Sequence, residues 1–351
     1  MTEPFSERFR APLQFGSGNT GERPLLLSVV VPCFNEEAVL RETNRCVVAA
    51  LQKAPMGFEV VYVDDGSSDS TPELLRELQT QDSRVRVVRF SRNFGHQVAI
   101  TAGLEHASGD AVVIIDADLQ DPPEVILEFL AKWLDGYDVV YGVRTDRAGE
   151  TAFKLWTAKI FYRFISRLSD TAIPIDTGDF RLMDRRVVNS LLSMPERDRF
   201  VRGMVSWLGF SQTGVPYRRA PRAAGSTKFS LFKMLRFALD GIFSFSILPL
   251  RLATWTGFAA SALAIFGIFV VLLDKFLAVP GMVKGWTSTV IAVLFIGGVQ
   301  LISLGIIGEY VGRIYGEAKR RPLYVVRERM GFEAQNQPAA RNLRPRIAAS
   351  R

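Results

Sequence analysis

The stretch "VVIIDADLQDPPEV", residues 112–125, decides the fold, because an apolar run ends there in a cluster of carboxylates. Residues 112–115 are apolar and β-branched, which is typical of a strand buried on both faces of a sheet. Three carboxylates follow, Asp116, Asp118 and Asp121, and a Pro-Pro pair then indicates the first turn of a helix. A core strand that ends in so much negative charge predicts a binding site rather than a simple turn.

The same alternation of strand and helix extends over the first half of the chain. Short apolar runs predict strands at 25–34, 58–65, 84–90, 110–118 and 137–142, and helical spacing predicts helices at 36–53, 72–80, 96–107 and 123–134. Strands that alternate with helices in this way form a Rossmann-like α/β unit with a mostly parallel sheet and right-handed crossovers. Ligands bind such sheets beyond the carboxyl ends of the strands.

Polar residues follow four of the expected strands and would meet at one edge of the sheet. They are Asn35 and Glu36 after the first strand, Asp64, Asp65, Gly66 and Ser67 after the second, Asn93 and Gly95 after the third, and Asp116, Asp118 and Gln120 after the fourth. Each group alone could be a helix N-cap, since Asp and Ser favour that position. Acid doublets at more than one strand end exceed what capping requires, which favours a binding site.

Asp116 and Asp118 lie about the end of the fourth strand, where two unpaired carboxylates would repel each other. A divalent cation would remove that repulsion. Mg²⁺ and Mn²⁺ take one or two protein carboxylates together with waters and substrate phosphates. The pattern therefore predicts a metal-bound diphosphate, and a nucleoside diphosphate is a feasible leaving group.

Composition narrows the classes of function. The 351 residues include 43 Lys and Arg against 36 Asp and Glu, and a net charge of +7 fits an anionic partner such as a nucleic acid, a phosphorylated substrate or a membrane surface. With two histidines in the sequence, a zinc enzyme is not expected. Cys33 and Cys46 are expected to be reduced thiols. Residues 1–24 have no apolar segment of a signal peptide and are expected to be a flexible lead.

The last third of the chain contains two long apolar runs, 252–273 and 286–308, each long enough to cross a hydrocarbon core of about 30 Å. A short loop joins them, which predicts a transmembrane hairpin; two buried helices of a soluble protein are the alternative. Lys and Arg are more numerous in the flanks than in the loop. This bias predicts a multi-pass protein of the inner membrane, with the N-terminal domain and both termini in the cytoplasm.

Two further segments combine basic and apolar residues at helical spacing. Residues 153–168 fit either a helix at the membrane interface or an ordinary core-facing helix. Residues 226–248 precede the first span and are expected to form an amphipathic juxtamembrane helix, with an ordinary core-facing helix as the alternative.

The stretches "VVVPCFNEE", "VDDGSSDST", "SRNFGHQVAITAGLEHASGD", "VIIDADLQDPPE", "VYGVR" and "DTGDFRLMDRRVV" make the chain resemble the family 2 inverting glycosyltransferases of the GT-A fold. Within them it is similar to the polyprenyl-phosphate glycosyltransferases, which include dolichyl-phosphate mannose synthases and undecaprenyl-phosphate (bactoprenol) glucosyltransferases with two C-terminal spans. The resemblance covers residues 25–320. The QxxRW box of processive synthases is not in the sequence, which indicates a single transfer.

The resemblance implies inverting transfer of a sugar, expected to be glucose from UDP-glucose, to the phosphate of a polyprenol. The implied donor-binding residues are Pro32, Asn35, Glu36, Asp64, Asp65, Gly66, Ser67, Asn93, Gly95 and Asp116. The implied ligands of Mg²⁺ or Mn²⁺ are Asp116, Asp118 and Gln120. The implied catalytic residues are Asp179 and Arg144, and the implied contacts of the acceptor phosphate are Arg163, Arg167, Arg202 and Lys228.

The role of Asp179 stays open, because a phosphate acceptor is already an anion and needs no strong base. Orientation of sugar hydroxyls or of a basic helix is the alternative to proton abstraction. GDP-mannose and a modified arabinose donor are alternative donors. A soluble acceptor, or a non-catalytic nucleotide-binding membrane module, are alternative functions, and Asp116, Asp118 and Arg144 count against the second. No nucleic-acid partner is expected.

The expected organisation is a flexible lead (1–24), a GT-A domain (25–225), a juxtamembrane helix (226–248), two spans (249–312) and a basic cytoplasmic tail (313–351). Glycines at 297–312 give the second span a face of small residues. Such a face would pack within the hairpin or between the protomers of a homo-oligomer.

Overall fold

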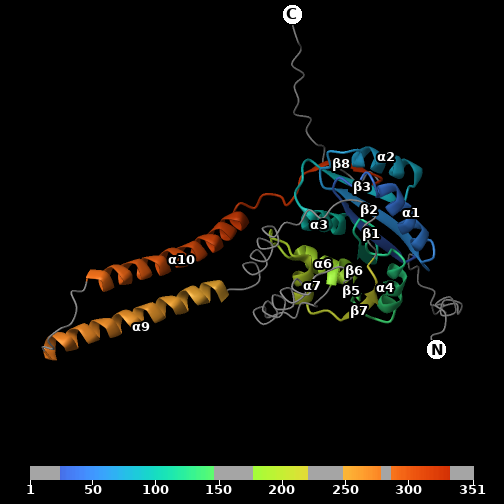
Figure 1. Cartoon of the computed structure of the whole chain (residues 1–351). Coiled ribbons are helices and arrows are strands. Elements are labelled where there is room, and N and C mark those ends of the chain that lie inside the picture. The colour runs from blue at the N-terminus through green and yellow to red at the C-terminus, as the bar shows by residue number, and fades with distance from the viewer. Residues whose placement is uncertain (1–23, 146–176, 220–247, 278–285, 333–351) are drawn as a thin grey trace, which may run out of the picture.

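The computed structural model describes residues 24–145, 177–219, 248–277 and 286–332 (Figure 1). The expected lead, the amphipathic segment 153–168 and the end of the tail lie outside these residues, as does all but the last residue of the expected juxtamembrane helix.

The four central strands form the parallel block that the sequence predicts. They are β1 (Leu26–Cys33), β2 (Gly57–Asp64), β3 (Val85–Phe90) and β4 (Ala111–Ile114), in the spatial order β3-β2-β1-β4. The crossovers are α1 (Leu40–Leu51), α2 (Thr71–Gln81) and α3 (His96–His106). Every residue of β4 is buried, as expected for an apolar strand with helices on both faces. Because β4 lies beside β1 on the side away from β2, the strand order reverses there, and ligands bind at such a point.

The sheet is more mixed than expected. In the full order β7-β5-β6-β4-β1-β2-β3-β8, four of the seven pairings between described strands are parallel. β6 (Thr177–Asp184) lies between β4 and β5 (Val139–Arg144) and is antiparallel to both, and β7 (Gln212–Tyr217) is parallel to β5. β6 is not among the strands expected from the sequence, because Asp179 and Arg181 interrupt its apolar pattern.

Helices cover both faces of the sheet (Figure 1). On one face, α1, α2 and α4 (Val125–Leu134) pack over a large apolar cluster that includes Val29, Val31 and Phe129. On the other face lie α3, α6 (Arg185–Ser193) and α7 (Val201–Trp207), whose cluster includes Val30 and Ile114. The alternate residues of β1 thus point into different clusters, as the period of a strand requires.

Part of the expected tail belongs to the sheet, which corrects the boundary at residue 313. Residues 313–318 continue a helix, and β8 (Val326–Met330) pairs antiparallel with the edge strand β3. The ring of Tyr324 stacks on Phe90 with 4.7 Å between centroids, and Arg76 Nη2 contacts Glu328 Oε2 at 2.8 Å. The chain therefore returns to the α/β domain after its long helices, a return that the polar sequence of this segment did not predict.

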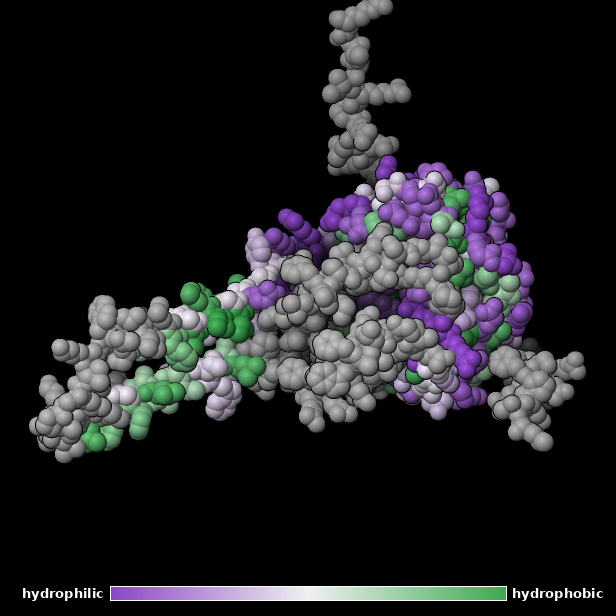
Figure 2. Space-filling view, in the orientation of Figure 1, coloured by the Kyte–Doolittle hydropathy of each residue, from purple (hydrophilic) through white to green (hydrophobic). Residues whose placement is uncertain are grey.

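Two long helices, α9 (Leu248–Leu277) and α10 (Trp286–Ala318), lie side by side and extend away from the α/β domain (Figure 1). At 1.5 Å per residue they are about 45 and 50 Å long. Their surfaces are largely apolar (Figure 2), and Trp255 and Leu301 are 71% and 72% exposed. Both side chains therefore project from the helices and are not packed into the apolar clusters of the sheet. Within the described residues, Phe295–Ala318 is long and apolar enough to cross a membrane, and a shorter apolar segment is Leu252–Gly267.

Candidate active site

A cleft of about 280 Å³ opens at the carboxyl ends of the central strands. The predicted site residues that line it are Pro32, Glu36, Asp65, Asn93, Gly95, Asp116 and Asp118, and Phe34 and His96 also contribute. These residues come from the ends of β1, β2 and β4 and from the segment between β3 and α3. The structure thus brings together the polar groups that the sequence placed at one edge of the sheet.

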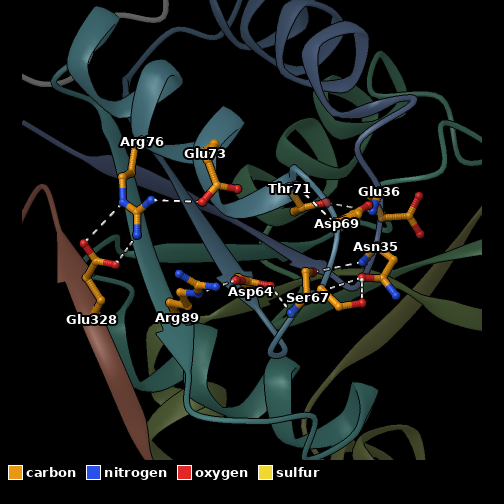
Figure 3. Close-up of polar contacts among 11 residues, drawn as sticks. Asn35, Glu36, Asp64, Ser67, Asp69, Thr71, Glu73, Arg76, Arg89 and Glu328 are labelled. Carbon is orange, nitrogen blue, oxygen red and sulfur yellow. Dashed lines mark hydrogen bonds and ion pairs between the residues drawn. The ribbon is translucent and has the colours of Figure 1, made fainter.

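The turn after β2 is held by hydrogen bonds to the loop after β1 (Figure 3). Asn35 N donates to Ser67 Oγ at 2.9 Å, and the Asn35 side chain accepts from the Ser68 amide. Asp64 is fully buried, accepts from the Ser67 amide at 2.8 Å and lies 3.2 Å from Arg89 Nε. Asp64 and Ser67 therefore stabilise the turn beside the cleft and do not line the cleft themselves.

Asp65 holds the segment between β3 and α3 in place at the cleft. Its carboxylate accepts from the backbone amides of Phe94, at 2.7 Å, and Gly95, at 2.9 Å. Burial raises the pKa of Asp65, although these two hydrogen bonds oppose the effect. The "RNFG" segment is thereby held over the end of β2.

Gly66 is required by its backbone and by its surroundings. Its φ of +72° lies in the left-handed region, and an added Cβ would lie 2.4 Å from the carbonyl carbon of Arg92. A side chain at this position would therefore push the turn after β2 away from the "RNFG" segment.

Gly66→Ala is expected to destabilise the protein by about 2 to 4 kcal/mol, because it adds the cost of a left-handed Ala to a backbone clash. Gly209→Ala is the matched control, since Gly209 has a φ of +73° and no atom within 4 Å of an added Cβ. Thermal unfolding of both purified variants measures the difference. Equal melting temperatures for the two would contradict the assigned contact with Arg92.

The loop after β4 presents the carboxylates of the opening stretch. Asp118 Oδ1 accepts from the Gln120 amide at 3.1 Å, and Leu119 between them has a φ of +56°, which costs about 1 to 2 kcal/mol for a residue with a branched side chain. Burial raises the pKa of Asp116 to about 6, against the opposing charge of His96. Asp116 Oδ1 is buried and accepts no hydrogen bond from the described residues. This strained loop holds an under-satisfied carboxylate at the cleft.

Asp179 on β6 is the centre of a second cluster beside Asp116. Its side chain, 10% exposed, lies 3.2 Å from Arg202 Nε and 3.4 Å from His96 Nε2, and it accepts from Gln97 Nε2 at 3.0 Å. Burial alone would raise the pKa of Asp179, but the hydrogen bond with His96 and the charge of Arg202 hold it well below its usual range. Asp179 is therefore a poor proton acceptor in this structure and a strong anchor for cations.

His96 connects the two acidic groups. Its Nε2 lies 3.6 Å from Asp116 Oδ1 as well as 3.4 Å from Asp179. Burial disfavours the protonated ring, but the hydrogen bond with Asp179 and the charge of Asp116 outweigh it and raise the pKa of His96. The imidazole thus lies between the loop after β4 and strand β6, where the two carboxylates favour its protonated form.

Arg144, at the end of β5, is held by Tyr217 and by a close approach to β6. Arg144 Nε donates to Tyr217 Oη at 3.4 Å, and Tyr217 Oη donates to the buried Asp121. An added Cβ on Gly178 would lie 2.6 Å from Arg144 Nη2. Arg144 and Arg202 therefore lie against the same 177–179 segment, since Arg202 Nη1 also donates to Thr177 O at 2.8 Å.

Arg163, Arg167 and Lys228 lie outside the described residues. Gln120 is buried, and its backbone amide donates a hydrogen bond to Asp118. Four residues at the site were not expected from the sequence: His96, Gln97, Arg181 and Tyr217. His96 and Gln97 follow "RNFG" directly and begin α3 at the same edge of the sheet, which is a signal that could have identified them. Tyr217 carries no such signal in the sequence.

Comparisons with known proteins identify the family of the chain. Residues 28–192 match the family model described as glycosyl transferase family 2. The chain is 50% identical over 311 residues to an uncharacterized glycosyltransferase of Bacillus subtilis (strain 168), covering 89% of this chain and 96% of that one. It is 43% identical over 302 residues to the bactoprenol glucosyl transferase of Shigella phage SfV, covering 86% and 98% of the two chains.

Among solved structures, the chain is similar to the mannosyltransferase PcManGT from Pyrobaculum calidifontis, with 20% identity, a TM-score of 0.41 and coverage of 81% of this chain and 88% of that one. The family assignment rests on the sequence relatives, because their alignments with this chain cover almost the whole length of each relative. The chain belongs to glycosyl transferase family 2 and is a glycosyltransferase.

Proposed function

We propose that this glycosyltransferase moves a glucosyl group, with inversion, from UDP-glucose to the phosphate of a polyprenol such as undecaprenol, at the cytoplasmic face of the inner membrane. The observation that carries the proposal is the 41–43% identity to proteins named bactoprenol glucosyl transferase or its homolog, over 86% of this chain and nearly all of theirs. The long exposed apolar helices and the two arginines beside the cleft support a lipid-borne anionic acceptor.

The cleft fits a nucleoside diphosphate bound with Mg²⁺ or Mn²⁺. Asp116 and Asp118 supply hard carboxylate ligands, and the buried Asp116 Oδ1 has no hydrogen-bond donor among the described residues. No group of three or more acidic, His or Cys side chains in the described ranges could hold an ion. The remaining ligands would come from water and the donor diphosphate, which is the usual arrangement for Mg²⁺. The ion would supply charge stabilisation of the leaving diphosphate.

The nucleoside would occupy the part of the cleft lined by Pro32, Glu36, Asp65 and Asn93. Asp65 and Asn93 are held by the contacts between the turn after β2 and the "RNFG" segment. Asn35, Asp64, Gly66 and Ser67 would act on the donor indirectly, by fixing that wall.

Arg144 and Arg202 would offset the repulsion between the donor diphosphate and the acceptor phosphate. Both guanidinium groups lie at the 177–179 segment of β6, next to the acidic loop that carries Asp116. Arg163, Arg167 and Lys228 are further candidates for contact with the acceptor phosphate. Because Arg202 is largely buried, its charge acts more strongly there than it would in bulk water.

The reaction needs alignment more than proton transfer. An anionic oxygen of the acceptor phosphate attacks the anomeric carbon of glucose, the bond from that carbon to the diphosphate oxygen breaks, and UDP leaves with the electron pair. No proton is removed from the acceptor. The lowered pKa of Asp179 therefore favours the anchoring role over that of a base.

We place α9 and α10 in the bilayer as a hairpin with both chain termini in the cytoplasm. Their exposed apolar surfaces and the Lys and Arg bias of the flanks support this topology. The end of α10 contacts the loop before α7: Arg313 Nη1 lies 3.2 Å from Asp198 Oδ2, and the Arg197 amide donates to Glu317 Oε1. A cleavable tag inserted at residue 280 should be protected from added protease in sealed inside-out vesicles. Cleavage of the tag in those vesicles would refute the topology.

The test is incubation of the purified full-length protein with radiolabelled sugar nucleotides, Mn²⁺ or Mg²⁺ and undecaprenyl phosphate. We expect label from UDP-glucose to enter the organic phase and to be released from it by mild acid as glucose. Transfer from GDP-mannose or an arabinose donor alone would replace the proposed donor. No transfer to lipid from any UDP- or GDP-sugar would refute the proposed function and favour a nucleotide-binding module.

A further inference from the structure

Gln97 uses both ends of its side-chain amide to join three elements near the cleft. It is the second residue of α3, its Nε2 donates to Asp179 Oδ2 on β6 at 3.0 Å, and its Oε1 accepts from the Val201 amide at 2.9 Å. A carboxylate can only accept and a backbone amide can only donate, so the orientation of the Gln97 amide is fixed by its two partners.

The contact with Val201 supplies a cap that α7 lacks in its own sequence. α7 begins at Val201, and the residue before it, Phe200, makes no side-chain capping hydrogen bond. The first amides of a helix have no partner within the helix. Gln97 satisfies the first of them from a neighbouring helix and thereby fixes the first turn of α7.

Arg202 is the next residue of that turn, and its guanidinium forms the ion pair with Asp179. Gln97 therefore holds the carboxylate of this pair directly and the guanidinium through the backbone of α7. Arg202 also donates to Thr177 O, so the first turn of α7 and the start of β6 are tied at two points.

We propose that Gln97 is a positioning residue that sets the place of Arg202 for the acceptor phosphate. This inference rests on the proposed transfer to a lipid phosphate, because it assigns Arg202 to that acceptor. This position needs a side chain that donates to Asp179 and accepts from the Val201 amide. The amide of Gln does both, whereas the carboxylate of Glu or the thioether of Met does not.

The experiment compares Gln97→Glu with Gln97→Met. Gln97→Glu keeps an acceptor for the Val201 amide but places a second carboxylate beside Asp179, which would draw Arg202 from its position. Loss of a hydrogen bond to a charged group corresponds to a change of about 10- to 100-fold in an equilibrium constant. We expect the apparent KM for undecaprenyl phosphate to rise by about tenfold or more, while the KM for the sugar nucleotide changes by less than about twofold. Gln97→Met should show the same change.

Hydrogen exchange at the first turn of α7 separates the two contacts without depending on transfer. Exchange in a peptide covering 200–208 should stay slow in Gln97→Glu and become faster in Gln97→Met. Gln52→Glu is the control for the added charge, because Gln52 is exposed at the end of α1. It should match the wild type in both measurements.

An unchanged acceptor KM in Gln97→Glu would overturn the inference, provided that the wild-type protein transfers sugar to the lipid. Absence of wild-type transfer would instead count against the proposed function. In that case, unchanged exchange of α7 in Gln97→Met would still refute the cap on Val201.

Discussion

Asp118→Ala is expected to lower the rate of sugar transfer by about 1,000-fold or more, the largest effect of any single substitution considered for this protein. The variant removes one of two carboxylates that line the cleft at the end of β4. With one carboxylate left, the ion that would neutralise the leaving diphosphate should bind much more weakly. Stabilisation of the leaving group by such an ion amounts to several kcal/mol. Initial rates of label transfer to undecaprenyl phosphate, at saturating donor, measure the loss.

A matched control is Asp135→Ala, which removes an exposed carboxylate at the end of α4 that pairs with Lys132. It should retain wild-type activity. Removal of divalent ions with EDTA should reduce wild-type transfer as strongly as the Asp118 substitution does, and added Mn²⁺ or Mg²⁺ should restore the wild type alone. Full transfer by Asp118→Ala would rule out the metal assignment.

Asp179→Asn is expected to reduce both stability and transfer. Asp179 faces Arg202 in a largely buried ion pair, and the half-exposed His96 lies beside them. Removal of one partner of a buried pair typically costs about 3 to 5 kcal/mol. We expect a clear fall in melting temperature and a loss of transfer of about 100-fold or more, because Arg202 would no longer be held at the cleft. Thermal unfolding and initial rates on the same preparation measure both effects.

The double variant Asp179→Asn with Arg202→Met distinguishes an anchor from a base. If Asp179 acts as an anchor, removal of the unpaired guanidinium should recover most of the lost stability, while transfer stays low because Arg202 is absent. A single Asp179→Asn variant with the wild-type melting temperature and little transfer would contradict the anchoring role and favour proton abstraction.

Local sequence patterns were sufficient to predict the central strands. β1, β2 and β4 are apolar on both faces, and their ends carry the polar residues that the structure gathers around the cleft. Asp116 and Asp118 could be placed at the cleft from the sequence because a parallel sheet brings strand ends to one edge whatever the details of the crossovers.

The remainder depends on contacts between distant segments. β6 escaped prediction because Asp179 and Arg181 occupy strand positions. The partners of Asp179, which are Gln97 and Arg202, lie 82 and 23 positions away in the sequence. β8 could not be predicted because its alternating charges are typical of an exposed segment. It is a strand because β3 offers a free edge to it, and pairing an edge is a property of the sheet and not of the added segment.

Isothermal titration of UDP into the detergent-solubilised protein, with and without Mn²⁺, tests the central claim that the acidic edge of the sheet binds a cation together with a diphosphate. We expect Mn²⁺ to tighten UDP binding by about tenfold or more in the wild type, and to have little effect in Asp116→Asn and Asp118→Asn. Equal affinity with and without the ion, or an undiminished effect of Mn²⁺ in both variants, would contradict it.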